Sequence, residues 1–283
     1  MEIDQSVGQK AFITRRMESK PFHMAPVEII IPFHGETTRV SNLMDSIFKT
    51  VHTTRYLITL VDDGSVNKSF IKDIDRHFSK PFRGVRCFQQ KEQKGFGAAV
   101  NLALANPWSD KITWVAIMQS DVLVSDNRWL SNLGECLNRL KSLAGQSESD
   151  PLGSVKMVSP MTDNPMIESE KLAEKFIGKK GDIRPDHVLT EGYLPMYCVL
   201  AHRELFKKVG PLIEKPYASI EAEDYAVRMR LMGYKQAVCG SSWVHHEGGL
   251  TLARYKDNTR VQEMLRKIKE EFDPGPKKEV LPG

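Results

Sequence analysis

The chain has no hydrophobic run long enough to cross a membrane, because about 20 consecutive apolar residues are needed and its longest apolar stretches are far shorter. Its first residues mix acidic, basic and polar side chains, without the apolar core of a secretory signal. Internal repeats and low-complexity segments are also absent. These absences predict a soluble cytoplasmic protein whose contact with a membrane, where there is one, is peripheral.

Cysteine is scarce, with four residues in 283, and none of them forms a C-x-x-C pair. The wide spacing favours buried free thiols in a reducing compartment over a disulfide framework or a zinc site. The four are Cys87, Cys136, Cys198 and Cys239.

Net charge is only mildly positive, at +4 with an isoelectric point near 8.7. This balance suits an anionic small ligand and does not require a nucleic acid. The hydrophobic fraction of 41% and charged fraction of 27% are ordinary for a globular protein. We therefore expect one large domain that buries a substantial core.

Apolar runs at residues 27–31, 56–61, 85–88 and 112–118 predict strands. Helical spacing of apolar residues predicts a helix over 40–51, with Thr37 or Thr38 as its N-cap, and small residues open another at 95. Alternating strands and helices predict an α/β fold with a Rossmann-like, mostly parallel sheet flanked by helices.

The pattern is looser after about residue 125. The spacing predicts helices over 127–140 and 223–232, a polar loop over 144–154, irregular structure over 160–190, and a strand end or loop over 243–249. An amphipathic stripe over 261–272 predicts a last helix. We expect an extension over 1–25, one domain over 26–252, and a C-terminal helix and tail over 253–283.

Two adjacent carboxylates, Asp62 and Asp63, end the second predicted strand and precede the turn residue Gly64. Ligands of open α/β sheets bind beyond the carboxyl ends of strands, where such acids can accept hydrogen bonds from a nucleobase or a ribose. An Asp-rich turn with no ligand is the structural alternative.

The glycine-rich run Gly95–Val100 resembles a dinucleotide fingerprint, but its sixth position is Val100 and it follows a polar stretch. Its small residues favour either close packing of a helix on the sheet or close approach of the backbone to a nucleotide, with phosphate at the helix N-terminus. Lys94 adds a positive charge directly before it.

Gln119-Ser120-Asp121 ends the most hydrophobic strand, where an unpaired buried carboxylate is costly. A Mg²⁺ or Mn²⁺ ion removes that cost, because these cations bind one or two carboxylates together with substrate phosphates. A solvated strand end is the alternative.

Two further clusters carry ionisable groups. Three acids, Glu221, Glu223 and Asp224, open a helical run, where they either favour the helix dipole or supply a general base. The adjacent His245 and His246 follow an apolar pair and are candidates for contact with a metal or a phosphate.

Taken in order, these segments resemble family 2 of the inverting nucleotide-sugar glycosyltransferases, which have the GT-A fold. The resemblance covers about residues 26–252 and includes a segment, 158–164, typical of the rhamnosyltransferase-like branch. The matching motifs are Val27–Pro32, Val61–Ser65, Gly95–Asn101, Met118–Val122 and Arg203–Gly210.

The resemblance implies a hexosyl- or deoxyhexosyltransferase that acts in the synthesis of a polysaccharide or other glycan. Its donor would be a UDP-, dTDP- or GDP-sugar, its acceptor a glycan or other hydroxyl compound, and its cofactor Mn²⁺ or Mg²⁺. The implied metal ligands are Asp121, His245 and His246. The implied nucleotide-binding residues are Pro32, His34, Asp62, Asp63, Lys94, Gly95, Gly97, Asn101 and Ser120.

Two positions depart from the family pattern. Gln119 stands at the first acid of the D-x-D motif, so metal binding rests mainly on Asp121. When the acidic helix is aligned on Arg228, Ala222 stands where the family has its base. We favour Asp224 as the base, with Glu221 and Glu223 as rivals.

Two other functions remain open on the sequence. Gln119 and Ala222 suit a degenerate GT-A module that binds a nucleotide-sugar or glycan without transferring sugar. A nucleotidyltransferase that forms nucleotide-sugars is the third hypothesis, but Pro32–Glu36 lacks the Gly-rich basic loop that such enzymes have after the first strand.

Overall fold

A computed structural model of the chain describes residues 26–35, 37–51, 54–67, 84–143, 155–165, 171, 187–190, 192–215 and 220–248. The N-terminal extension over 1–25 and the helix and tail over 253–283 lie outside the described residues, so these predictions are not tested.

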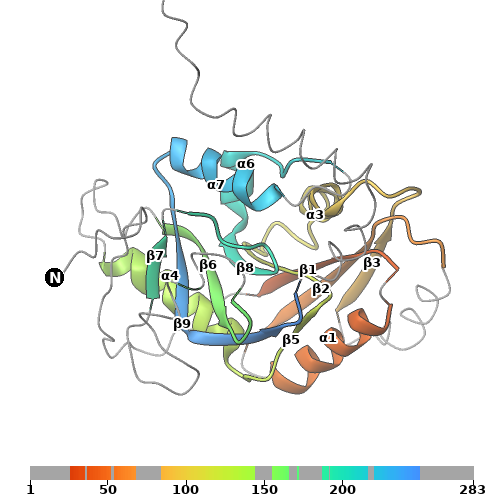
Figure 1. Ribbon diagram of the computed structural model, residues 1–283, viewed down its shortest axis with the longest axis horizontal. Coiled ribbons are helices and arrows are strands. Elements are labelled where there is room, and N and C mark those ends of the chain that lie inside the picture. Colours follow the sequence, from red (N-terminus) through yellow and green to blue (C-terminus); the bar gives the residue numbers. More distant parts are fainter. Residues whose placement is uncertain are drawn as a thin grey trace, which may run out of the picture.

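A nine-stranded sheet forms the centre of the described part (Figure 1). Its order is β3-β2-β1-β4-β8-β6-β9-β5, and β7 pairs with β9 outside this path. The first four strands are parallel: β1 (Val27–Phe33), β2 (Tyr56–Asp62), β3 (Val85–Gln89) and β4 (Trp114–Met118).

The remaining five strands extend the sheet beyond β4. They are β5 (Val122–Leu123), β6 (Val155–Thr162), β7 (His187–Thr190), β8 (Cys198–His202) and β9 (Lys235–His246). β8 runs antiparallel to β4 and β6, and β9 runs parallel to β6, whereas β5 and β7 run antiparallel to β9. Strands β6 and β9 therefore share the direction of β1–β4, so the sheet is mostly parallel.

Helices cover both faces of the sheet (Figure 1). One hydrophobic cluster joins the sheet to α1 (Thr37–Thr50) and α4 (Trp129–Leu143), and includes Met44 and Leu137. The other joins it to α3 (Phe96–Ala105), α6 (Arg203–Val209) and α7 (Glu221–Leu231), and includes Ala99 and Tyr225. This two-layered cover confirms the predicted α/β class.

The structure corrects several predicted elements. Residues 160–162 and 187–190 are strands, although irregular structure was predicted over 160–190. The predicted strand end at 243–246 belongs to a long strand, β9, and β8 was not predicted at all. Helix α1 begins at Thr37, so this threonine is its first residue. Cys136, Cys198 and Cys239 are buried free thiols as predicted, whereas Cys87 is only partly buried.

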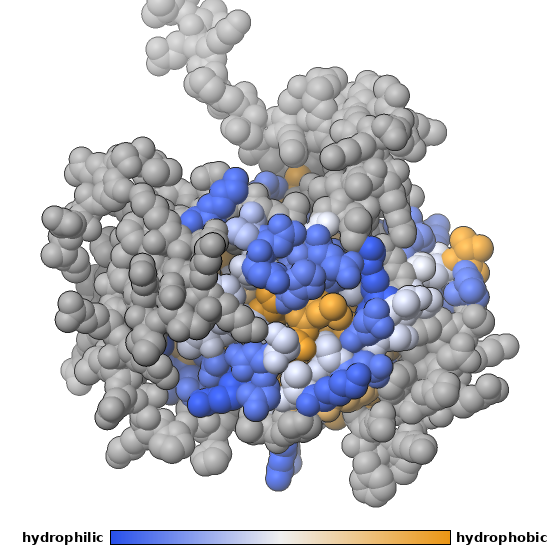
Figure 2. Space-filling model, turned by 60° about the horizontal axis from the view of Figure 1, so that its bottom comes forward, coloured by the Kyte–Doolittle hydropathy of each residue, from blue (hydrophilic) through white to orange (hydrophobic). Residues whose placement is uncertain are grey.

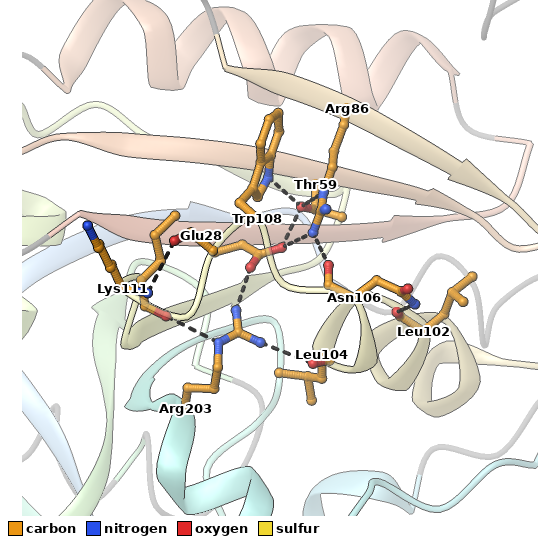
Figure 3. A network of polar contacts seen from close by, with 11 residues as sticks. Glu28, Thr59, Arg86, Leu102, Leu104, Asn106, Trp108, Lys111 and Arg203 are labelled. Carbon is orange, nitrogen blue, oxygen red and sulfur yellow. Dashed lines mark hydrogen bonds and ion pairs between the residues drawn. The ribbon is translucent and has the colours of Figure 1, made fainter.

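A buried ionic network ties the amino-terminal end of β1 to three other elements (Figure 3). The Glu28 side chain is fully buried, and its carboxylate binds the guanidinium groups of Arg203 and Arg86. Thr59 Oγ1 donates to Glu28 Oε1 at 2.5 Å and accepts from Trp108 Nε1 at 3.0 Å. The apolar run 27–31 predicted a strand but gave no role to the acid within it, Glu28.

The surface view in Figure 2 shows mainly hydrophilic residues over the described part of one face, with a small hydrophobic patch between them. No helix in the described ranges is long and apolar enough to cross a membrane.

Candidate active site

The chemistry-bearing residues gather where the parallel strands end. Asp62 is the last residue of β2, Asp121 follows β4, and His246 is the last residue of β9. Backbone hydrogen bonds link these ends: Asp63 N–H donates to the Phe33 carbonyl at 2.8 Å, and Glu247 N–H donates to the Asp121 carbonyl at 3.0 Å. Because six strands point the same way, their loops form one edge, which is where open α/β sheets bind ligands.

The buried carboxylate of Asp62 lies at this edge. Its Oδ1 accepts from the Ser65 amide at 2.9 Å, and its Oδ2 accepts from Gln89 Nε2 at 3.0 Å. These two bonds hold the carboxylate in one orientation and leave each oxygen a further lone pair for a ligand.

Asp63 ties three loops together. Its carboxylate accepts from the amides of Lys94 and Gly95 at 2.7 and 2.9 Å, and its carbonyl accepts from His34 Nδ1 at 2.7 Å. The carboxylate therefore anchors the loop that leads into α3. The sequence predicted only that this acid accepts a hydrogen bond from a nucleobase or a ribose, so its structural role was not predicted.

The glycine-rich helix start packs against the segment that precedes α7. A Cβ added to Gly97 would lie 2.0 Å from the Ile213 carbonyl oxygen. Asn101 Nδ2 donates to the Leu212 carbonyl at 2.8 Å, and its Oδ1 accepts from the Leu212 amide at 2.9 Å. The close approach at Gly97 is thus to this segment, whereas the sequence predicted close packing of the glycines on the sheet or on a nucleotide. Asn101 holds the same segment through Leu212.

We expect Gly97→Ala to destabilise the protein by about 1–3 kcal/mol, because the new methyl group would overlap backbone atoms that cannot rotate away. In most helix interiors the same change is stabilising by roughly 0.5–1 kcal/mol, since alanine is the better helix former. Urea denaturation of both proteins measures the difference. A midpoint equal to or above that of the wild type would contradict the contact.

Asp121 and His246 form the best candidate for a metal site. His246 Nε2 lies 3.6 Å from Asp121 Oδ2, and the two side chains are 8% and 11% exposed, respectively. Asp121 Oδ1 and His246 Nδ1 are buried without a hydrogen-bond partner among the described residues. An unpartnered buried carboxylate oxygen is costly, and a divalent cation would satisfy it.

No group of three or more His, Cys, Asp or Glu side chains that could hold a metal gathers among the residues that the structure describes. Two protein ligands nevertheless suit Mg²⁺ or Mn²⁺ at a nucleotide site, because substrate phosphates and water complete their coordination. The residues present therefore fit the predicted metal.

His245 does not join this pair. Adjacent residues of a strand point to opposite faces, and the half-exposed His245 ring turns away from Asp121 to donate from Nδ1 to the Asp163 carboxylate at 2.8 and 2.9 Å. Asn164 Nδ2 donates to the carbonyl of His246 at 3.1 Å and so holds the end of β9. Residues 158–164 resemble a family segment, but neither Asp163 nor Asn164 has a role that the sequence predicts.

The three acids at the start of α7 have different surroundings. The buried Glu221 has one oxygen, Oε1, without a partner in the described part of the chain. Burial raises the pKa of its carboxyl to about 8, helped by the nearby charges of Glu223 and Asp224 and opposed by hydrogen bonds from the Glu221 and Gly97 amides.

Asp224, in contrast, forms an ion pair with Arg228 of the same helix. Its Oδ2 accepts from Arg228 Nε at 3.0 Å and from Nη2 at 2.5 Å. The same guanidinium also donates to the Val209 carbonyl at 3.0 Å and lies over the Tyr225 ring. The Asp224 carboxylate is therefore engaged in an ion pair with its own helix rather than available to an acceptor hydroxyl.

The other predicted residues lie on the surrounding loops and strand ends. Pro32 and His34 are at the end of β1, next to Asp63. Lys94 is more than half exposed beside Glu92, and Ser120 is buried directly before Asp121.

Comparisons with known proteins agree with the fold. Three solved structures share the fold of this chain at 14–18% sequence identity. A mannosyltransferase from Pyrobaculum calidifontis, in complex with GDP-Man and Mn²⁺, is 18% identical with a TM-score of 0.56, over 87% of this chain and 64% of that one.

The other two structures were solved with a nucleotide or a nucleotide-sugar. TarS of S. aureus, in complex with UDP-GlcNAc, is 15% identical with a TM-score of 0.58, over 88% of this chain and 66% of that one. GalNAc-T7 with UDP, GalNAc and Mn²⁺ is 14% identical with a TM-score of 0.57, over 89% and 52%. The chain thus spans between half and two thirds of the length of these neighbours.

No curated protein sequence matches the chain. Residues 28–184, however, match the family described as glycosyl transferase family 2. This match does not single out the rhamnosyltransferase-like branch, which stays a prediction. The matched residues make up more than half of the chain and include the motifs Val61–Ser65, Gly95–Asn101 and Met118–Val122, so the chain belongs to glycosyl transferase family 2.

Proposed function

We propose that this protein transfers a hexosyl or deoxyhexosyl group from a nucleoside-diphosphate donor to an acceptor hydroxyl, in a single displacement that inverts the anomeric carbon. The observation that carries the proposal is that Asp62 and the Asp121–His246 pair lie at the carboxyl ends of the parallel strands. The start of α3 is bound to Asp63 at this edge, and its Gly97 amide donates to Glu221 of α7. Solved structures of the same fold hold GDP-Man, UDP or UDP-GlcNAc.

The nucleoside of the donor would lie against the ends of β1 and β2. The oriented Asp62 carboxylate is available to accept from a nucleobase N–H. Asp63 would act indirectly, because its oxygens hold the amides of Lys94 and Gly95. Lys94 itself is exposed at this loop and can contribute charge to an anionic ligand.

Asp121 and His246 would hold the divalent cation through a carboxylate oxygen and a ring nitrogen. When bound, such an ion offsets the negative charge that grows on a departing nucleoside diphosphate.

Glu221 is the acid that we propose as the base, in place of the originally favoured Asp224. Its carboxylate would take the proton of the acceptor hydroxyl while the oxygen forms a bond to the anomeric carbon and the bond to the diphosphate breaks. An acid with a pKa of about 8 is well matched to this task near neutral pH. Glu221 also directly precedes Ala222, the position where the family pattern has its base.

A thermal-shift screen tests the donor and the metal together. We expect UDP, dTDP or GDP to raise the melting temperature by several °C, because a ligand that binds only the folded state stabilises it by mass action. Adding Mn²⁺ should enlarge the shift, and Asp121→Ala should abolish that increment.

The matched control for this screen is Asp126→Asn. Asp126 lies before α4, where its Oδ1 accepts from the Arg128 amide at 2.8 Å. This variant should keep the full response to Mn²⁺. Absence of a shift with every nucleotide would overturn the proposed function.

A further inference from the structure

Tyr197, which directly precedes β8, contacts the ring of His246. The Tyr197 and His246 rings are stacked, with centroids 4.2 Å apart and planes 18° from parallel. Both residues are buried, at 1% and 6% exposure. The contact is thus a close parallel stack in the protein interior.

Histidines that bind metals usually receive their orientation from a hydrogen bond to the ring nitrogen that does not bind the metal. His246 lacks this bond, because its Nδ1 is buried without a partner among the described residues while Nε2 faces Asp121. Something other than a hydrogen bond must therefore hold the imidazole plane.

Tyr197 is itself held from both ends. Its hydroxyl donates to the Pro160 carbonyl at 3.4 Å, and its backbone carbonyl accepts from the Gln119 amide at 2.8 Å. Gln119 begins the turn that carries Asp121. One residue thus contacts the ring of His246 and fixes the backbone that carries its partner.

We propose that Tyr197 is a positioning residue for the metal site, and that its ring sets the plane of His246 in place of the usual hydrogen bond. This inference rests on the proposed function only in requiring that Asp121 and His246 bind a divalent cation. It predicts that the aromatic ring, and not the hydroxyl group, is what metal binding requires.

The test measures Mn²⁺ binding to the full-length protein without nucleotide, from the electron paramagnetic resonance signal of free Mn²⁺. Replacing Tyr197 by methionine removes the ring and should weaken binding about tenfold, within the range found when support of a metal ligand is lost. Tyr197→Phe keeps the ring and should bind within about twofold of the wild type.

Tyr56→Leu is the matched control for loss of a tyrosine ring. Tyr56 starts β2 at the opposite edge of the sheet and packs against Phe48. Its loss should lower stability without changing the affinity for Mn²⁺.

A double-mutant cycle separates positioning from a general loss of structure. In a His246→Ala background, the Tyr197→Met change should cost no further affinity, because the ring acts through His246. Wild-type affinity in folded Tyr197→Met, or loss of binding in Tyr197→Phe, would overturn the inference. If the wild type does not bind Mn²⁺, or if His246→Ala binds Mn²⁺ as tightly as the wild type, the proposed metal site is wrong instead.

Discussion

Replacing Glu221 by glutamine is expected to lower kcat by roughly 10²–10⁴-fold, the usual contribution of a general base. The amide keeps the shape of the side chain but accepts no proton from the acceptor hydroxyl. Donor binding should persist, because the Asp62 and Asp121 positions are untouched. Steady-state kinetics of sugar transfer, with a thermal-shift measurement of nucleotide binding, checks both parts.

The pH dependence of kcat/KM provides a second test of Glu221 as the base. A base works only when deprotonated, so kcat/KM of the wild type should rise with pH and level off above about 8, the pKa that burial and the neighbouring acids impose. Below this value the rate should fall about tenfold per pH unit. The residual activity of Glu221→Gln should not show this rise.

Stability should change with pH in the opposite direction. The folded state holds the Glu221 proton up to about pH 8, whereas a carboxyl with the ordinary pKa of 4.5 loses it much earlier in the unfolded chain. The contribution of Glu221 to folding stability is therefore present at low pH and lost as the pH rises from 4.5 through about 8. Glu221→Gln should consequently be more stable than the wild type at pH 9.

Asp224→Asn tests whether Asp224, rather than Glu221, is the base. Since Asp224 is paired with Arg228, its replacement should lower stability yet leave a much faster enzyme than Glu221→Gln does. If Asp224→Asn abolishes transfer and Glu221→Gln does not, the role returns to Asp224. If neither changes turnover, neither acid is the base, and Glu223 is the candidate that is left in the first turn of α7.

The second large effect is expected from Glu28→Gln, which should destabilise the protein by about 3–5 kcal/mol. The substitution leaves two guanidinium groups facing a neutral amide. The Arg203 side chain is only 9% exposed, so its charge cannot recover hydration. Chemical denaturation monitored by circular dichroism measures the loss.

An exposed pair provides the control for the same substitution. Glu135 on α4 binds Arg128 at 3.0 Å, with the arginine side chain 55% exposed. Glu135→Gln should cost no more than about 1 kcal/mol, because solvent screens exposed ion pairs. Equal losses of unfolding free energy in Glu28→Gln and Glu135→Gln would show that burial does not strengthen the ion pairs of Glu28.

Folded Glu28→Gln should retain its turnover. Glu28 is the second residue of β1, whereas the candidate site lies beyond the carboxyl ends of the parallel strands. An activity loss larger than the loss of folded protein would reveal coupling between the two edges.

The parallel half of the sheet was predictable because each strand is a short apolar run that ends in a turn or polar motif. Residues 56–61 and 112–118 show this, and both ends carry the predicted acids. β9 was missed over most of its length. Its register shifts between the Pro160–Cys239 and Met161–Trp243 pairs, and this irregularity breaks the alternation that identifies a strand.

The sequence by itself determined the family, the strand-end acids and the glycine-rich helix start, because these depend on local residue order. Only the tertiary structure decided which polar groups are partnered. It separates His245 from His246, places Arg228 on Asp224, and buries one oxygen of Glu221 without a partner in the described ranges. These assignments depend on contacts between residues far apart in the chain and on exclusion of water, neither of which a local pattern encodes.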